Sequence, residues 1–137
     1  MTDVVMSIKP VHLKRIVAGV KNYEFRKYIP TKGVDRLWIY TSSPVCKLEY
    51  LAVIDRIVSY PDKITEEGIG NAEFNNGEKE AIHAYHIGEL YKLKAPLTLA
   101  KLKEDYHFTA PQSFIYLGSN EKLNECLQSA EMEKVIF

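Results

Sequence analysis

The first residues divide into two faces with a period of two, and one of these faces is entirely apolar. In residues 3–9, DVVMSIK, the side chains of Val4, Met6 and Ile8 share one face, and the residues between them face the other way. This alternation and the content of β-branched residues predict a short strand.

The period then changes to that of a helix. Leu13, Ile16 and Val17 recur at i, i+3 and i+4, and a proline precedes them at the first helical turn. The spacing predicts a helix over residues 11–18, with His12 and the basic residues beside it facing outward.

A period of two returns after Gly19, which lies where a left-handed cap would end the helix. The alternation divides the stretch VKNYEFRKY into two faces. One face carries Lys21, Tyr23, Phe25 and Lys27, and the other carries Asn22, Glu24 and Arg26.

The remaining pattern predicts further short elements joined by turns. Strands are expected at residues 36–42, 46–60, 91–93 and 113–118. Helices are expected near residues 62–67, at residues 99–105 after a Thr98 cap, and after a Ser119 cap near the C-terminus. The acidic, Gly- and Asn-rich stretch from residue 61 to residue 80 is expected to be an irregular insert.

This order of elements favours an α+β fold. Strands at short intervals with few, short helices predict a mixed β-barrel of about five to six strands with flanking helices. The length of 137 residues predicts one domain over residues 1–137. The connections are too short for a doubly wound parallel sheet.

Composition narrows the class of protein. The apolar fraction of 46% and charged fraction of 26% are ordinary for a globular domain. Cys46 and Cys126 are too far apart for a zinc knuckle and do not form a disulfide framework. The N-terminus lacks the pattern of a signal peptide and no apolar run could span a membrane, so a cytoplasmic location is expected. His83 and His86 lack a third ligand nearby in sequence, so no metal or cofactor is expected.

Charge is distributed unevenly although the formal net charge is zero. Residues 1–47 hold nine Lys or Arg against three Asp or Glu, a net of +6, and the remaining 90 residues hold nine against fifteen, a net of −6. The asymmetry suggests a basic face for an anionic ligand.

Two groups of side chains leave more than one interpretation open. The aromatic residues of the basic first third are either core residues or a wall on which a base stacks. The strand end Tyr40, Thr41, Ser42 and Ser43 either caps a turn or binds a polar ligand.

Glu24 and Arg26 share one strand face, two residues apart. They are either a solvent-exposed ion pair, worth under about 1 kcal/mol, or part of a pocket with Lys21.

Several stretches together resemble the ASCH domain family. SIKP at residues 7–10 and GVKNYEFRK at residues 19–27 resemble the family pattern Gly-x-Lys-x-x-x-x-Arg after the first helix. IYTSSPV at residues 39–45 and APQSFIYL at residues 110–117 are similar to a bacterial and phage subgroup described as transcriptional regulators. The resemblance runs from residue 4 to about residue 118. It implies a PUA-like pseudo-barrel with a cleft beside the first helix, suited to RNA or a nucleoside.

The resemblance also implies roles for single residues. Gly19 would make the turn, and Lys21 and Arg26 would be the cleft cations. Some family members hydrolyse an acyl amide on a modified cytidine with this lysine and a threonine three positions later. Glu24 occupies that position here, and a carboxylate is a poor replacement for the hydroxyl nucleophile. Family hydrolases also use a downstream carboxylate, for which the candidates are Glu66, Glu67 and Glu73.

Three hypotheses follow. The first is an RNA- or nucleotide-binding module, with DNA as an alternative partner, no membrane partner and a role in regulating transcription or translation. Its ligand-binding residues would be Lys9, Lys21, Glu24, Arg26, Lys27, Tyr40, Thr41, Ser42 and Ser43. The second is a hydrolase acting on a modified nucleoside or RNA, amidohydrolase- or nuclease-like, with Lys21 and Glu24 as catalytic residues. The third is an interaction or structural domain whose cleft binds protein or nothing.

Overall fold

A single mixed sheet organises the chain. The computed structural model describes residues 1–136, and over these residues seven strands form one sheet. The strands are β1 (Asp3–Ile8), β2 (Tyr23–Arg26), β3 (Arg36–Thr41), β4 (Lys47–Ser59), β5 (His83–Thr98), β6 (Phe114–Tyr116) and β7 (Met132–Ile136). The helices are α1 (Pro10–Val17), α2 (Asn71–Asn75), α3 (Leu99–Tyr106) and α4 (Glu121–Gln128), with a 3₁₀ turn at Leu117–Ser119.

The strand order is β2-β5-β4-β3-β1-β6, and β7 pairs with β5. β1 and β3 are parallel, and the other pairs are antiparallel. The predicted α+β fold with a barrel-like mixed sheet and short helices is confirmed, in the form of an open half-barrel. The expected strand number is exceeded because β7 was not predicted.

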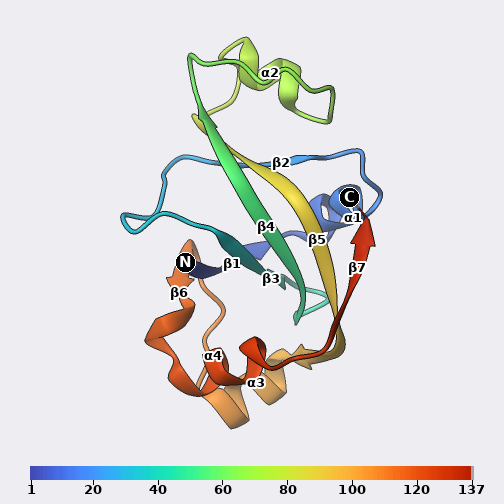
Figure 1. Cartoon of the computed structure of the whole chain (residues 1–137), viewed down its shortest axis with the longest axis vertical. Coiled ribbons are helices and arrows are strands. Elements are labelled where there is room, and N and C mark those ends of the chain that lie inside the picture. The colour runs from blue at the N-terminus through green and yellow to red at the C-terminus, as the bar shows by residue number, and fades with distance from the viewer. Residues whose placement is uncertain (137) are drawn as a thin grey trace.

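β4 and β5 are long, bulged strands that run the length of the molecule (Figure 1). At one end their connection, residues 60–82, carries α2; we call it the β4–β5 excursion. At the opposite end lie α3 and α4 (Figure 1). The register shifts along β4 and β5 bend both strands, as β-bulges do, and curve the sheet.

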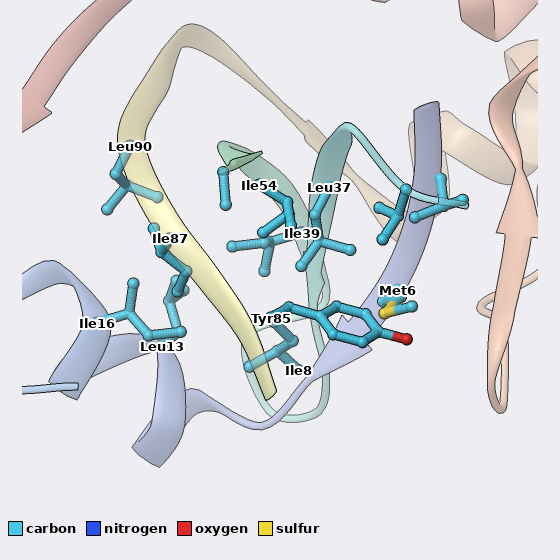
Figure 2. Close-up of a cluster of buried hydrophobic side chains, with 13 residues drawn as sticks. Met6, Ile8, Leu13, Ile16, Leu37, Ile39, Ile54, Tyr85, Ile87 and Leu90 are labelled. Atoms are coloured by element: carbon cyan, nitrogen blue, oxygen red, sulfur yellow. The ribbon is translucent and has the colours of Figure 1, made fainter. Parts of the chain in front are cut away.

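Both faces of the sheet are buried. On one face, Leu13 and Ile16 of α1 pack beside Ile87 of β5, together with side chains from β1 and β3 (Figure 2). On the other face, α3 and α4 cover a cluster around Trp38 that includes Leu102 and Leu123. This explains why β1 and β3 read as nearly continuous apolar runs.

Two caps show how local sequence sets helix ends. The Thr98 side chain accepts a hydrogen bond from the Lys101 amide, which confirms the predicted cap of α3. The cap of α4 was predicted one residue too early. It is Asn120, whose side chain accepts from the Leu123 amide, while the Ser119 hydroxyl bonds back to the Tyr116 carbonyl.

The predicted helix near residues 62–67 is wrong. Helix α2 begins later, after Gly70, whose φ of 88° lies in the left-handed region that glycine tolerates. In place of the expected helix, Ile64 is held by two hydrogen bonds to the Asn75 side chain. Phe74 and Ile64 then pack against Tyr23 and fix the excursion to the sheet.

Candidate functional site

A cleft with a volume of about 480 Å³ opens between α1, β2 and the C-terminal end of the excursion. Its walls include His12 from α1, Lys21 from the turn after α1, and the three β2 residues from Glu24 to Arg26. Tyr28, Lys79 and Ser113 complete them. A smaller lobe of about 200 Å³ adjoins it and shares His12, Glu24 and Arg26.

The turn after α1 aims the chain into this cleft. Gly19 has a φ of 78°, and the amides of Val20 and Lys21 both donate to the Arg15 carbonyl at 3.1 Å. β2 pairing begins only at Tyr23. The strand predicted from residue 21 therefore begins two residues later. Lys21 lies against Phe25, as the alternation predicted, but it lines the same cleft as Glu24 and Arg26.

Glu24 and Arg26 form a largely buried pair. Arg26 Nη2 lies 3.0 Å from Glu24 Oε2 and also donates to the Ser7 carbonyl at 3.0 Å. The side chains of Arg26 and Glu24 are only 16% and 9% exposed, so the solvated-face interpretation does not hold. Arg26 Nε is buried without a hydrogen-bond partner within residues 1–136. The guanidinium therefore keeps one N–H group unsatisfied in the described part of the chain.

Lys21 is the most unusual residue of the cleft. It is 5% exposed, and its Nζ lies 4.5 Å from the centroid of the Phe25 ring. Among residues 1–136 it makes no ion pair and no side-chain hydrogen bond. Burial lowers the pKa of Lys21; Glu24 opposes this, and the positive charges of Lys79, Arg15 and Arg26 add to it. A buried ammonium group without an acceptor is costly.

Two cleft residues were missed by sequence reasoning. His12 was expected to face outward, but it lines both lobes, and its Nδ1 is buried without a partner in the described part of the chain. Burial lowers the pKa of His12, and the Lys21 charge adds to the effect. Lys79 reaches the cleft from the excursion, and its Nζ also lies 4.5 Å from the Phe25 centroid. Neither residue belongs to a sequence motif that could have revealed it.

A pair of hydroxyl groups lies at the other side of the lining. Ser113 Oγ donates to Tyr28 Oη at 2.7 Å, and the Tyr28 carbonyl accepts from Tyr85 Oη at 2.5 Å. These residues come from the loop before β6 and the segment after β2. The loop that carries Ser113 belongs to the APQSFIYL stretch that the sequence singled out.

The other predicted ligand-binding residues divide into two groups. Lys9 lines the small lobe, and Lys27 lies at the cleft rim, paired with Glu80 at 2.9 Å. The strand end from Tyr40 to Ser43 does not complete the cleft wall. Tyr40 and Thr41 are buried in the core, where Tyr40 packs on Phe108. Ser42 and Ser43 lie in the turn after β3, where the Ser42 amide donates to the Ile8 carbonyl.

None of the three downstream carboxylates lines the cleft. Glu66 pairs with Arg56 and accepts a hydrogen bond from Tyr23 Oη at 2.8 Å. Glu67 lies beside it in a separate depression, and Glu73 is exposed on α2. The structure therefore brings none of these three candidates into the cleft lining, and it places Glu66 and Glu67 at a separate depression.

The contacts of Glu66 extend into a polar cluster on β4 and β5. Arg56 Nη2 donates to Tyr23 Oη at 3.0 Å, and His86 Nδ1 lies 2.6 Å from Asp55 Oδ1. Burial would raise the pKa of Glu66, but hydrogen bonds from Tyr23 and Arg56 outweigh it and lower the pKa to about 2. Burial and the bond to Glu66 raise the pKa of Tyr23 to about 12. We call Tyr23, Arg56, Glu66, His86 and Asp55 the latch, because they fasten the excursion to the sheet.

Two kinds of feature are absent from residues 1–136, a metal-binding cluster and a membrane-spanning helix. Over residues 1–136, no three His, Cys, Asp or Glu side chains are arranged to hold a metal ion together. No helix in that range is both long and apolar enough to cross a membrane.

The fold and the cleft together define a small α+β half-barrel with a cationic cleft beside its first helix. A protein named ASCH domain-containing ribonuclease, from Zymomonas mobilis, is 29% identical to this chain. The alignment covers 88% of this chain and 92% of the relative. A scan against protein-family models finds no match.

Solved structures of the Zymomonas mobilis ASCH protein have the same fold. A serine-to-alanine mutant matches with a TM-score of 0.69 and 26% identity, covering 94% of this chain and 96% of the other. A tyrosine-to-phenylalanine mutant matches with a TM-score of 0.72 and 25% identity, covering 96% of this chain and all of the other. Over nearly its whole length, the chain is therefore similar to this ASCH domain protein and shares its fold.

Proposed function

We propose that this protein binds RNA in the cleft beside α1. The observation that carries the proposal is Lys21, a buried ammonium group that lines the cleft and has no acceptor among residues 1–136. The neighbouring Arg26 guanidinium, with one N–H group unsatisfied within the same residues, adds a second positive charge to the cleft. The similarity to a protein named as a ribonuclease favours RNA over other polyanions.

The cleft residues divide the work of binding. Lys21 and Arg26 hold phosphate or a base carbonyl group, because both offer donors in a site with little water. Glu24 orients the Arg26 guanidinium through their ion pair. Lys9 extends the cationic surface into the smaller lobe.

Fluorescence anisotropy with short labelled RNAs tests this proposal. For wild-type protein, the logarithm of the binding constant is expected to fall by about 0.7 per tenfold increase in salt for each phosphate contacted. Lys21→Met keeps most of the side-chain volume and removes the charge, and is expected to weaken binding by about tenfold, as for the loss of one charged hydrogen bond. Lys103→Met, on the exposed surface of α3, is the matched control. Measurements with DNA of the same sequence and with single nucleotides show which ligand is preferred. An absence of RNA binding at low salt would refute the proposal.

RNA cleavage is a second candidate function, favoured by His12. A neutral imidazole with an unpartnered, buried nitrogen lies in the cleft beside the Lys21 cation. His12 takes the proton of a ribose 2′-hydroxyl, and the 2′-oxygen attacks the adjacent phosphorus. The bond from phosphorus to the 5′-oxygen breaks, and the Lys21 ammonium protonates that oxygen. The products are a 2′,3′-cyclic phosphate and a free 5′-hydroxyl.

Tyr28 and Ser113 are candidates for positioning the RNA in that reaction. They are the tyrosine and the serine that line the cleft within residues 1–136, and they bond to each other. A tyrosine and a serine are also the residue types changed in the Zymomonas mobilis structures.

A quenched-fluorophore RNA measures cleavage directly. His12→Ala is expected to reduce the rate by about 100-fold or more, the contribution of a general base. A substrate with a single 2′-deoxy position is expected to resist cleavage at that position. If the wild-type protein leaves RNA intact, or cuts the deoxy position equally well, this second candidate is wrong and the binding proposal stands.

Two finer proposals rest on the family resemblance alone. A role in regulating transcription or translation would follow from RNA binding and is tested by the RNAs that copurify with the protein. Deacylation of a modified nucleoside is disfavoured, because Glu24 is buried against Arg26 where the nucleophile is needed.

A further inference from the structure

Two ammonium groups converge on one aromatic ring in the cleft. Lys21 Nζ and Lys79 Nζ each lie 4.5 Å from the Phe25 centroid, so the two nitrogens are at most 9.0 Å apart, twice that distance. Both side chains also line the same cleft, so a phosphate group at this end of the cleft lies close to two positive charges. The ring contributes a cation–π contact to each ammonium group.

The carboxylates of the cleft are engaged elsewhere. Glu24 pairs with Arg26 at 3.0 Å, and Glu80 pairs with Lys27 at 2.9 Å. Within residues 1–136, neither Lys21 nor Lys79 forms an ion pair or a side-chain hydrogen bond. Four Lys or Arg side chains and two Glu side chains line the cleft, which leaves two positive charges uncompensated when His12 is neutral.

An excess of two positive charges matches a phosphomonoester better than a backbone phosphate. A phosphate diester carries one negative charge, whereas a terminal phosphate carries about −1.5 to −2 at pH 7 and has three free oxygens. The excursion also bounds the cleft at the Lys79 end. A Cβ at Gly70 would lie 2.8 Å from the Phe25 ring and 3.0 Å from Lys79 Cε, so backbone closes tightly over this pair.

We propose that Lys21 and Lys79 form a subsite for the terminal phosphate of an RNA chain or nucleotide. The inference rests on the proposed RNA-binding function and names the part of the ligand that the cleft recognises. It makes Lys79 a specificity-determining residue, while the rest of the cleft holds the nucleotides next to the end.

Binding of one RNA sequence in three forms tests the subsite: with a 5′-phosphate, with a 3′-phosphate, and with hydroxyl groups at both ends. All three carry 2′-O-methyl groups, which prevent attack by the 2′-oxygen during the measurement. Wild-type protein is expected to bind one phosphate-ended form about tenfold more tightly than the hydroxyl-ended form at equal ionic strength, the gain of one charged hydrogen bond. The better phosphate-ended form shows which end is read.

The variants separate this subsite from general RNA affinity. Lys79→Met is expected to abolish the preference for the phosphate end, because it weakens binding of the phosphate-ended RNA more than binding of the hydroxyl-ended RNA. Lys79→Arg is expected to restore the preference, and Lys103→Met to retain it. The preference is also expected to decline below about pH 6, where a terminal phosphate takes up its second proton.

The outcomes distinguish the two proposals. Equal binding of all three RNAs to wild-type protein overturns the subsite and leaves RNA binding intact, as does a preference that survives Lys79→Met. If no RNA binds, the proposed function fails, and calorimetric titration with uridine monophosphates and uridine decides the subsite. Binding of a monophosphate but not uridine then supports the subsite, and binding of neither, or of both equally, refutes it.

Discussion

Lys21 illustrates a conflict between folding and binding at the scale of one residue. Its ammonium group is removed from water and has no counter-ion bonded to it among residues 1–136, which costs folding free energy. Under the proposed function, the same arrangement leaves the group available to a ligand. Replacing a poorly compensated buried charge with an apolar side chain of similar volume is commonly neutral or stabilising.

Lys21→Met is therefore expected to raise the free energy of unfolding by about 1 kcal/mol at pH 7. The pKa of Lys21 is lower in the folded than in the unfolded chain, so the unfolded chain binds more protons between the two pKa values. Wild-type stability then rises with pH across that window, and the advantage of Lys21→Met shrinks towards pH 10. Urea denaturation of both proteins at several pH values measures this. A variant less stable than the wild type at pH 7 would contradict it.

Asp3 has the opposite character, since its carboxylate is well compensated. It accepts hydrogen bonds from Arg36, Trp38 and Gln128. Burial would raise the pKa of Asp3, but these three bonds outweigh burial and the pKa is lowered. A lowered carboxyl pKa contributes stability that is complete above the unfolded value near pH 4 and is lost as the pH falls through the folded value.

Asp3→Asn is expected to lower the free energy of unfolding by about 2 kcal/mol at pH 7, as for the loss of hydrogen bonds to a charged group. The difference from the wild type should diminish in acid, below about pH 4, because protonation removes the same charge. Chemical denaturation at pH 7 and pH 3 provides the measurement. Asp62→Asn, at an exposed position, serves as the control and should leave stability unchanged.

At the scale of elements, the excursion depends on the latch. Glu66 joins the excursion to β2 and β4 through Tyr23 and Arg56, and its pKa of about 2 keeps it charged down to strongly acidic pH. Glu66→Gln is expected to increase amide hydrogen exchange in residues 62–80 by about fivefold, since an ion pair this exposed is worth at most about 1 kcal/mol. The neighbouring change Glu67→Gln is the control. Unchanged exchange in Glu66→Gln would show that Phe74 packing alone holds the excursion.

Alanine substitutions at two glycines with the same backbone conformation distinguish the cost of backbone strain from the cost of close contact. Gly33 and Gly70 have φ values of 80° and 88°, but a Cβ at Gly33 meets nothing within 4 Å. Gly33→Ala is expected to cost about 1–2 kcal/mol, the penalty of a left-handed conformation. Gly70→Ala should cost more, because its Cβ also meets Phe25 and Lys79. Thermal denaturation compares the two, and equal losses would show that Phe25 and Lys79 move aside freely.

At the scale of the whole molecule, the two main core clusters share one sheet, so neither is expected to unfold alone. Trp38, the single tryptophan, is fully buried between β3 and the helices at one end. Its fluorescence and the far-UV circular dichroism are expected to give the same denaturation midpoint, as in a two-state transition. Separate midpoints would show that the excursion or the α3–α4 end unfolds independently.

Sequence reasoning succeeded where one face of an element is buried and its ends carry clear caps. The local sequences of β1, α1 and β3 were sufficient to predict these three elements. The Gly19 turn and the Thr98 cap were also evident from their own residues. β7 was missed because MEKVI is short and finds its partner, β5, only in the folded sheet. Helix α2 was misplaced because its start depends on a glycine conformation rather than on periodicity.

The cleft was only partly predictable, for a related reason. Lys21, Glu24 and Arg26 lie in one short stretch, so their common location could be inferred from the motif. His12 resembles any polar residue on the outer face of a helix, and Lys79 comes from an acidic insert far along the chain. Tyr40 belongs to a strand end rich in hydroxyl groups, as ligand-binding strand ends are. Its side chain is nevertheless buried, because it packs on Phe108 in the core. Tertiary packing decides such cases.

Because Lys79 comes from the β4–β5 connection, one wall of the cleft can change independently of the other. One wall is built from α1 and β2, which contribute side chains to the core clusters. The Lys79 wall is carried by a hairpin connection, and such connections tolerate changes in length and sequence far better than the strands they join. Evolution or design could therefore exchange residues 60–82 to alter which ligand end is accepted, while the half-barrel itself stays the same.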